Sequence, residues 1–178
     1  IRSTFAVTQG KWYAEFKFDS GSYCNFGVTD IDDAMKVGDS YTGVSGSLYS
    51  IGHDQTNSYY TNGATIANGS TFTTGDIISI ALDMDNGKVH FAKNGTYELS
   101  SVPASNTGGL TLPSTNYYQF SHGNYSSSSS ANYGNPPFTI SSGNSDGNGY
   151  GNFEYSVPSG YYALNTKNLA EYGWCYVY

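Results

Sequence analysis

The sequence predicts an all-β fold in which two antiparallel sheets pack into a β-sandwich. Composition is the first reason, because 18 Tyr, 22 Gly and only 12% charged residues suit pleated strands and turns better than long helices. The second is the alternation of apolar and polar residues along short segments. The third is the frequency of turn signals between these segments, which favours a sandwich over alternating strands and helices.

The first predicted strand covers residues 10–18, where apolar residues recur at every second position. Its apolar face consists of Trp12, Ala14, Phe16 and Phe18. The alternation indicates a strand with one buried face. We therefore expect the intervening residues to be exposed, namely Lys11, Tyr13, Glu15 and Lys17.

Further strands are predicted at residues 26–29 and 47–52. Asn62-Gly63 predicts a two-residue hairpin turn, because both residue types adopt positive φ readily. The strongest local pattern is residues 77–95, where apolar alternation flanks Asp85-Asn86-Gly87. It predicts a β-hairpin.

The second half of the chain combines short apolar runs with stretches rich in Ser, Gly and Asn. A strand is predicted at residues 117–121. The stretches at about 121–135, with consecutive serines at 126–130, and at 141–152 are expected to be loops that bury little surface. We predict one domain over residues 1–169, followed by a tail of unassigned role at 170–178.

Four segments in order resemble the SPRY family of concanavalin-like, jelly-roll β-sandwiches. They are residues 10–16, 26–28, the hairpin formed by 75–83 with 87–95, and the asparagine-aromatic-glycine-x-x-proline-phenylalanine element at 132–138. Four segments in succession, covering about residues 10–138, are far more specific than any one alone. The resemblance implies a SPRY-type sandwich that binds through loops at one end.

Residues 157–169 also resemble the ending of SPRY-like domains in tailed-bacteriophage virion proteins. This implies a non-enzymatic virion structural or host-recognition module, such as a tail-fibre, appendage or capsid-surface domain. The expected location is the virion surface or the extracellular space. Its partners would be copies of itself, other virion proteins, or a host surface glycan or protein. Two alternatives stay open, a carbohydrate-binding module of a larger extracellular protein and an intracellular adaptor that binds short peptides.

Charge and hydropathy exclude two classes of partner. The net charge of -7 and the pI of about 4.6 argue against nucleic acid, because binding to phosphates depends on clustered Lys and Arg and only seven are present. No stretch approaches the roughly 20 apolar residues of a membrane span, and residues 1–9 lack a signal-peptide pattern. We expect no membrane span.

No catalytic residues, cofactor or metal site are predicted. Asp83-x-Asp85 resembles the start of a calcium loop, but the twelfth position is Asn94 rather than Glu. No Gly-x-Ser-x-Gly elbow lies between a predicted strand and helix, and the three histidines lack metal-ligand spacing. The densest acidic group is interpreted as a solvated loop and comprises Asp30, Asp32, Asp33 and Asp39.

Cys24 and Cys175 are expected to be free, buried thiols, although a bridge between them stays open. Tyrosine is the residue type expected to serve binding, because it combines rigid contact area with a hydroxyl group. Half of the loop tyrosines, Tyr133 among them, fit core positions equally well. The candidate ligand-binding residues are Tyr23, Tyr41, Tyr125, Tyr133, Tyr150 and Asn124.

Overall fold

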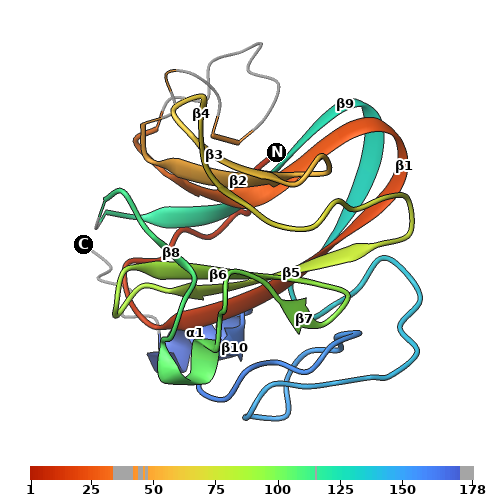
Figure 1. Ribbon diagram of the computed structural model, residues 1–178. Helices are drawn as coiled ribbons and strands as arrows, with labels where there is room; N and C mark the ends of the chain where they lie inside the picture. The colour runs from red at the N-terminus through yellow and green to blue at the C-terminus, as the bar shows by residue number, and fades with distance from the viewer. Residues whose placement is uncertain (34–41, 44–45, 47, 115, 173–178) are drawn as a thin grey trace.

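The computed structural model describes residues 1–33, 42–43, 46, 48–114 and 116–172. Three residues named above, Asp39, Tyr41 and Cys175, lie outside these ranges. The predicted sandwich is confirmed, since two antiparallel layers face one another across an apolar core (Figure 1). The layers are nevertheless continuous, because one sheet curls over on itself to form both.

Two long strands, β1 (Lys11–Asp30) and β9 (Tyr118–Asn132), run antiparallel through the curl and belong to both layers. The predicted strands at 10–18 and 26–29 are therefore the two ends of β1. In the upper layer of Figure 1 the sheet continues from β1 through three strands in turn: β2 (Ser50–Asp54), β3 (Ser58–Thr61) and β4 (Ala64–Asn68).

The lower layer contains the predicted hairpin. The first half of β1 pairs with β5 (Ile77–Asp83), and β5 pairs with β6 (Lys88–Lys93). Two short strands, β7 (Thr96–Tyr97) and β8 (Leu110–Thr111), pair with β6, and a 3₁₀ turn, η1 (Pro103–Ser105), lies between them.

The C-terminal part of the chain returns to the lower layer. β10 (Tyr162–Ala163) pairs with the start of β1 in a parallel manner, whereas the other strand pairs among the described residues are antiparallel. It is followed by α1 (Thr166–Tyr172), whose last residue stacks its ring on Tyr162 at a centroid distance of 4.0 Å. The helix thus crosses the predicted domain end at residue 169.

The turn at Asn62-Gly63 is confirmed. It joins β3 to β4 with φ of 48° at Asn62 and 74° at Gly63. Positive φ at both central residues defines the turn type whose twist matches that of the flanking strands. Asn94-Gly95 joins β6 to β7 with the same signs.

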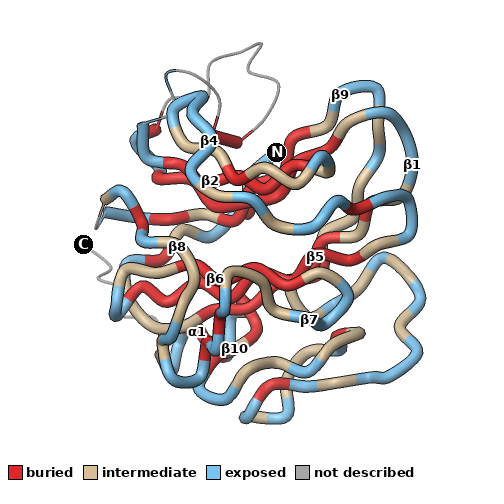
Figure 2. The backbone as a smooth tube through the Cα atoms, in the orientation of Figure 1, coloured by how far each residue is buried: buried red, intermediate tan, exposed pale blue. Residues whose placement is uncertain are grey.

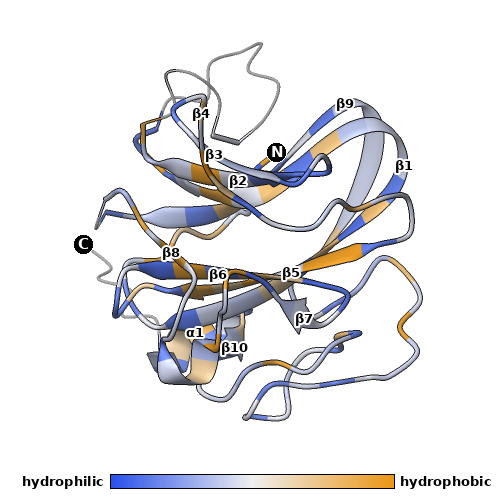
Figure 3. Cartoon of the chain, viewed as in Figure 1, coloured by the Kyte–Doolittle hydropathy of each residue, from blue (hydrophilic) through white to orange (hydrophobic). Residues whose placement is uncertain are grey.

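The serine-rich stretch is a strand, and the prediction of a loop there was wrong. Residues 121–132 pair with β1 through the curl, and Ser127 to Ser130 each have a partner on β1. The hydroxyl groups of Ser127, Ser129 and Ser130 find acceptors, and that of Ser130 lies 2.6 Å from a carboxylate oxygen of Asp19. Pairing with a distant strand overrides the weak strand propensity of serine, and its small side chain suits the curl, which Figure 3 shows as a pale stretch of β9.

The main core lies between the layers. It contains the predicted apolar face of β1 together with Phe26, Phe72, Phe91 and Phe120. Phe16 is central, with ring centroids 5.5 Å from Phe26 and 6.3 Å from Phe120. Figure 2 shows the buried residues on the facing strands and the exposed ones on β4 and the turns.

The opposite face of the lower layer is also buried, which corrects the expectation for two residues. Tyr13 and Glu15 are 0% exposed. Tyr13 packs with Phe153, Tyr161 and Ala163, all from the chain after β9. That segment covers the outer face of the sheet, and a single strand's alternation gives no sign of it.

Cys24 is a free thiol buried in the core, as predicted. Burial raises its pKa to about 12, with a smaller effect from the charge of Asp54. The thiol is therefore protonated and unreactive at physiological pH.

Candidate functional site

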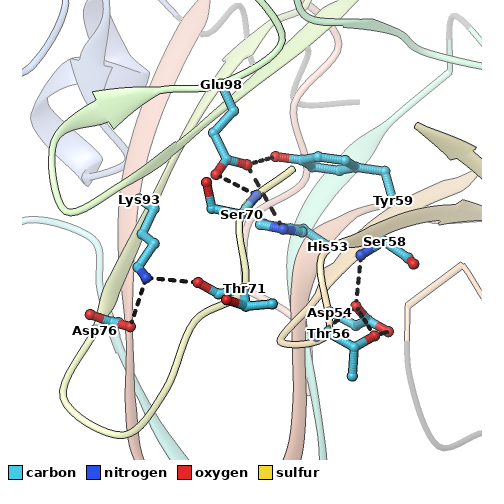
Figure 4. A network of polar contacts seen from close by, with 10 residues as sticks. All are labelled: His53, Asp54, Thr56, Ser58, Tyr59, Ser70, Thr71, Asp76, Lys93 and Glu98. Atoms are coloured by element: carbon cyan, nitrogen blue, oxygen red, sulfur yellow. Dashed lines mark hydrogen bonds and ion pairs between the residues drawn. The ribbon is translucent and has the colours of Figure 1, made fainter. Parts of the chain in front are cut away.

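A network of polar side chains lies at the open edge between the layers, where the chain crosses from β4 to β5 (Figure 4). We call it the Glu98 network. The Glu98 carboxylate accepts hydrogen bonds from the hydroxyl of Tyr59 and from the backbone N–H of Ser70, the latter at 2.9 Å. Gly69 is required beside it, because a Cβ there would overlap the Glu98 carboxylate and the Tyr59 ring.

His53 lies behind Glu98, with Nε2 3.8 Å from a carboxylate oxygen, and stacks on Tyr59 at a centroid distance of 4.1 Å. The side chain is 0% exposed. Burial lowers the pKa of His53 well below its ordinary value, although the charges of Glu98 and Asp54 oppose the shift. The imidazole is thus neutral at physiological pH and shielded from solutes.

Lys93 forms the outer part of the Glu98 network. Its Nζ lies 3.2 Å from a carboxylate oxygen of Asp76 and donates to the Thr71 carbonyl at 2.7 Å. Asn94 donates to the other Asp76 oxygen at 2.6 Å, and Lys93, Asn94 and Glu98 border a hollow of about 430 Å³. Because these charged groups bond to one another and to the crossover, we infer that the network fastens the crossover to the lower layer.

Tyr59→Phe tests this interpretation. We expect it to lower the free energy of unfolding by about 2 kcal/mol, because the largely buried Glu98 carboxylate loses the hydrogen bond that the Tyr59 hydroxyl donates to it. Urea denaturation measures the change. Tyr125→Phe is the matched control, since that ring is 64% exposed, and should change stability by less than about 0.5 kcal/mol. Equal stabilities of the two variants would contradict a fastening role.

A second feature is an apolar surface at the end of the sandwich where β1 ends and β2 and β9 begin. Four side chains there are between 39% and 54% exposed. The backbone holds them together, because Asp30 N donates to Tyr49 O at 3.0 Å and Ile31 N donates to Tyr117 O at 2.8 Å. We call this the loop-end surface, and it consists of Ile31, Leu48, Tyr49 and Tyr117.

Two aspartates next to the loop-end surface make hydrogen bonds inside the protein, which corrects the interpretation of the acidic group as a solvated loop. Asp30 and Asp33 are buried. Asp33 accepts a hydrogen bond from Tyr49 N at 3.1 Å, and Asp30 accepts one from the hydroxyl of Ser114. Burial raises the pKa of Asp33, and the hydrogen bond from Tyr49 counteracts it. Among the described aspartates of this acidic group, only Asp32 is exposed.

Three of the predicted binding residues lie together on the curl, away from the loop-end surface. Tyr23 and Tyr125 are direct partners across β1 and β9, and Asn124 pairs with Cys24. Tyr125 is 64% exposed, whereas Tyr23 is half-buried and donates to Asp54 at 3.3 Å. Asn124 accepts a hydrogen bond from Ser129 at 3.1 Å. Tyr125 thus offers the most open contact area of the three.

The remaining predicted residues lie elsewhere. Tyr133 is half-buried and packs its ring against Phe16 and Phe120, each at 6.0 Å, so it is a core residue. Tyr150 belongs to the segment that covers the lower layer, with Lys167 Nζ 4.8 Å from its ring centroid. Tyr41 is outside the described residues. The predicted set therefore does not form one site.

The sequence interpretation missed the loop-end residues. Ile31 stands within an acidic segment, and Tyr117 opens a predicted strand, so the local pattern around each indicates no binding role. The signal that identifies Ile31 is a large apolar residue flanked by Asp on both sides. Such a residue is either covered by another segment or exposed for contact.

No cluster of three or more His, Cys, Asp or Glu suited to a metal ion occurs among the described residues. Within the same residues, α1 is the one α-helix, and it is far too short to cross a membrane. The Gly-x-Ser-x-Gly motif of serine nucleophiles does occur, at residues 143–147. These residues form a loop rather than a strand-to-helix elbow. Asp146 is buried there and accepts backbone N–H groups from Asn148 and Tyr150 at 2.9 Å.

Comparison with known proteins identifies the family. The model of the SPRY domain matches residues 11–113, more than half of the chain. The chain belongs to the SPRY family. SPRY domains are typically modules of protein interaction and are generally non-catalytic. A search of curated protein sequences gives no match.

A solved structure with a similar fold is the SPRY domain of human HERC1. It has a TM-score of 0.55 and 20% sequence identity, and the alignment covers 72% of this chain and 75% of that chain. At this identity the likeness shows the fold alone. The range matched by the SPRY family model, residues 11–113, includes β1 to β8 and thus both layers, whereas β9 and the segment that covers the lower layer lie beyond that range.

Proposed function

We propose that this SPRY domain is a non-enzymatic recognition module that binds a protein partner through the loop-end surface. The observation that carries the proposal is the grouping of four exposed apolar side chains from three separate chain segments at one end of the sandwich. Exposed apolar groups of this kind mark interaction sites on soluble domains. Aromatic residues such as Tyr49 and Tyr117 are enriched among those that contribute most to binding.

The surface suits binding because its base is rigid. Backbone hydrogen bonds join the three segments, Asp33 accepts a further hydrogen bond from Tyr49 N, and Asp30 accepts one from Ser114. Side chains held in place before binding lose less conformational entropy when a partner covers them. We expect the partner to present apolar side chains and backbone groups.

A peptide-display library tests the proposal on the full 178-residue chain. Peptides selected by the wild-type domain should be rich in apolar residues. Ile31→Ser and Tyr117→Ser should each weaken the affinity of a selected peptide about tenfold or more. Isothermal titration calorimetry measures this.

Ile66→Ser is the matched control, because Ile66 is 43% exposed on β4 and is not part of the loop-end surface. The affinity of the Ile66→Ser variant for the selected peptide should stay within about twofold of wild type. Selected peptides that bind all three variants equally would refute this site, and thermal unfolding of each variant excludes a loss of fold as the cause.

The virion role and the extracellular location remain proposals, supported by the resemblance of residues 157–169 to phage SPRY-like endings. Light scattering of the native protein tests self-assembly. Large symmetric or fibrous particles favour a structural virion module, and a monomer that selects short linear peptides favours the intracellular adaptor.

Glycan contact is a second candidate, favoured by the exposure of Tyr125 on the curl. An exposed aromatic ring flanked by Asn124 and serines has the chemistry to stack on a sugar and hydrogen-bond its hydroxyl groups. A glycan-array screen that yields a ligand lost in Tyr125→Ala and retained in Ile31→Ser would assign binding to the curl instead of the loop-end surface.

A further inference from the structure

A polar pocket lies between the start of β1, the β5–β6 turn and α1, separate from the loop-end surface and the Glu98 network. Its volume is about 650 Å³, and its lining includes Gln9, Lys11, Asp85, Tyr162, Glu171 and Tyr172. Five stretches of the chain build it, namely residues 9–11, 85, 104, 159–162 and 171–172. We propose that this pocket binds a cationic side chain of a partner protein, arginine or lysine.

The charge of the pocket favours a cation. Lys11 is already neutralised, because its Nζ lies 3.0 Å from a carboxylate oxygen of the fully buried Asp83. Two further carboxylates, those of the exposed residues Asp85 and Glu171, line the same pocket. With Lys11 paired, the pocket is negative, and the net charge of -7 adds a long-range attraction for basic groups.

Each of the two carboxylates makes a hydrogen bond within the protein. One oxygen of Asp85 accepts a hydrogen bond from Gly10 N at 2.7 Å, which ties the β5–β6 turn to the start of β1. Glu171 accepts a hydrogen bond from the hydroxyl of Tyr172 at 3.1 Å. A guanidinium or ammonium group between such carboxylates forms charge-assisted hydrogen bonds, which are stronger than neutral ones.

The aromatic wall supplies the second part of the recognition. Tyr162 and Tyr172 are stacked at 4.0 Å with an interplanar angle of 7°, and both line the pocket. Cations bind to aromatic rings, and the planar guanidinium group does so best. The chain uses this contact elsewhere, since Lys167 lies 4.8 Å from the centroid of the Tyr150 ring.

Titration with capped amino acids, followed by NMR, tests the proposal on the full chain. The probes are N-acetylargininamide, N-acetyllysinamide and N-acetylcitrullinamide, the last an uncharged isostere of arginine. We expect saturable shifts of the amide signals of Asp85, Gly160, Glu171 and Tyr172 with the two cationic probes. The citrulline probe should bind about tenfold more weakly or not at all.

Asp85→Asn and Glu171→Gln remove the charges and keep an oxygen acceptor. Each should weaken the arginine probe about fivefold to tenfold, and Asp32→Asn, an exposed carboxylate elsewhere, should leave its affinity unchanged. Equal shifts with the citrulline probe, or undiminished binding by both pocket variants, would overturn the proposal. The loop-end variants Ile31→Ser and Tyr117→Ser should bind the probe normally, so this test is independent of the proposed recognition surface.

Discussion

Glu15→Ala is expected to lower the free energy of unfolding by about 4 kcal/mol. The Glu15 carboxylate is fully buried and accepts hydrogen bonds from the backbone N–H groups of Glu154 at 2.9 Å and Tyr155 at 2.8 Å. It also accepts from the Tyr13 hydroxyl at 3.2 Å and from Asn132 Nδ2 at 3.3 Å. Alanine leaves these buried donors without their acceptor, and each unsatisfied group costs about 1–3 kcal/mol.

The variant should also loosen the segment that covers the lower layer. Glu15 joins β1 to residues 154 and 155, across nearly 140 positions of sequence. Hydrogen exchange at the Glu154 and Tyr155 amides should accelerate more than exchange in β5, which β1 and β6 hold from both sides. Burial raises the pKa of Glu15, and the hydrogen bonds from Glu154 and Tyr155 counteract this shift.

Urea denaturation and hydrogen exchange measure both effects. Glu15→Gln keeps one acceptor oxygen and should lose about half as much stability as Glu15→Ala. Glu171→Ala, an exposed glutamate, should stay within about 0.5 kcal/mol of wild type. A loss below about 1 kcal/mol in Glu15→Ala would show that other contacts hold the covering segment.

Acidification from pH 7 to pH 4 is expected to remove up to about 3 kcal/mol of stability through His122. Burial, and to a lesser extent the terminal ammonium group, lowers the pKa of His122 to about 4 from an ordinary 6.5. Between these values the folded state binds fewer protons than the unfolded state. The stability supplied by the neutral ring is therefore fully present above pH 6.5 and is lost as the pH falls toward 4.

Other groups modify this dependence. His53 has a lowered pKa for the same reason and acts in the same direction, whereas Glu15 and Asp33 have raised pKa values and oppose it. Urea unfolding at pH 7, 5.5 and 4 should show the net loss. His122→Gln should lose less unfolding free energy between pH 7 and pH 4 than wild type, by most of the roughly 3 kcal/mol assigned to His122. A pH profile identical to that of wild type would exclude His122 as the cause of the loss.

The local elements were predictable because their signals are short-range. The β5–β6 hairpin follows from apolar alternation around Asp85-Asn86-Gly87, and the Asn62-Gly63 turn follows from the ease with which both residues adopt positive φ. Trp12, Ala14, Phe16 and Phe18 face the core as their spacing predicts. The order of four such segments was sufficient to indicate the SPRY family, which the family match over residues 11–113 confirms.

The site was less predictable, because exposure depends on what lies opposite a residue. Tyr133 is of a residue type common in binding loops, yet its ring packs on Phe16. Ile31 is of a type that is usually buried, yet it is 46% exposed. Asp30 and Asp33 have the residue type of a solvated loop but are buried. The contacts that decide such outcomes join segments that are separated in the sequence, such as Tyr133 with Phe16 and Asp30 with Ser114.

By itself, the sequence determined the strands with strong alternation, their turns and the all-β class, since these depend on residues a few positions apart. Only the tertiary structure decided that Ser127 to Ser130 form a strand, that Glu15 is buried, and that Ile31 and Tyr117 meet on one surface. The physical reason is that each of these features requires pairing between segments roughly 85 to 140 residues apart. The hydrogen bonds and buried area that such pairing supplies outweigh the local preferences a sequence displays.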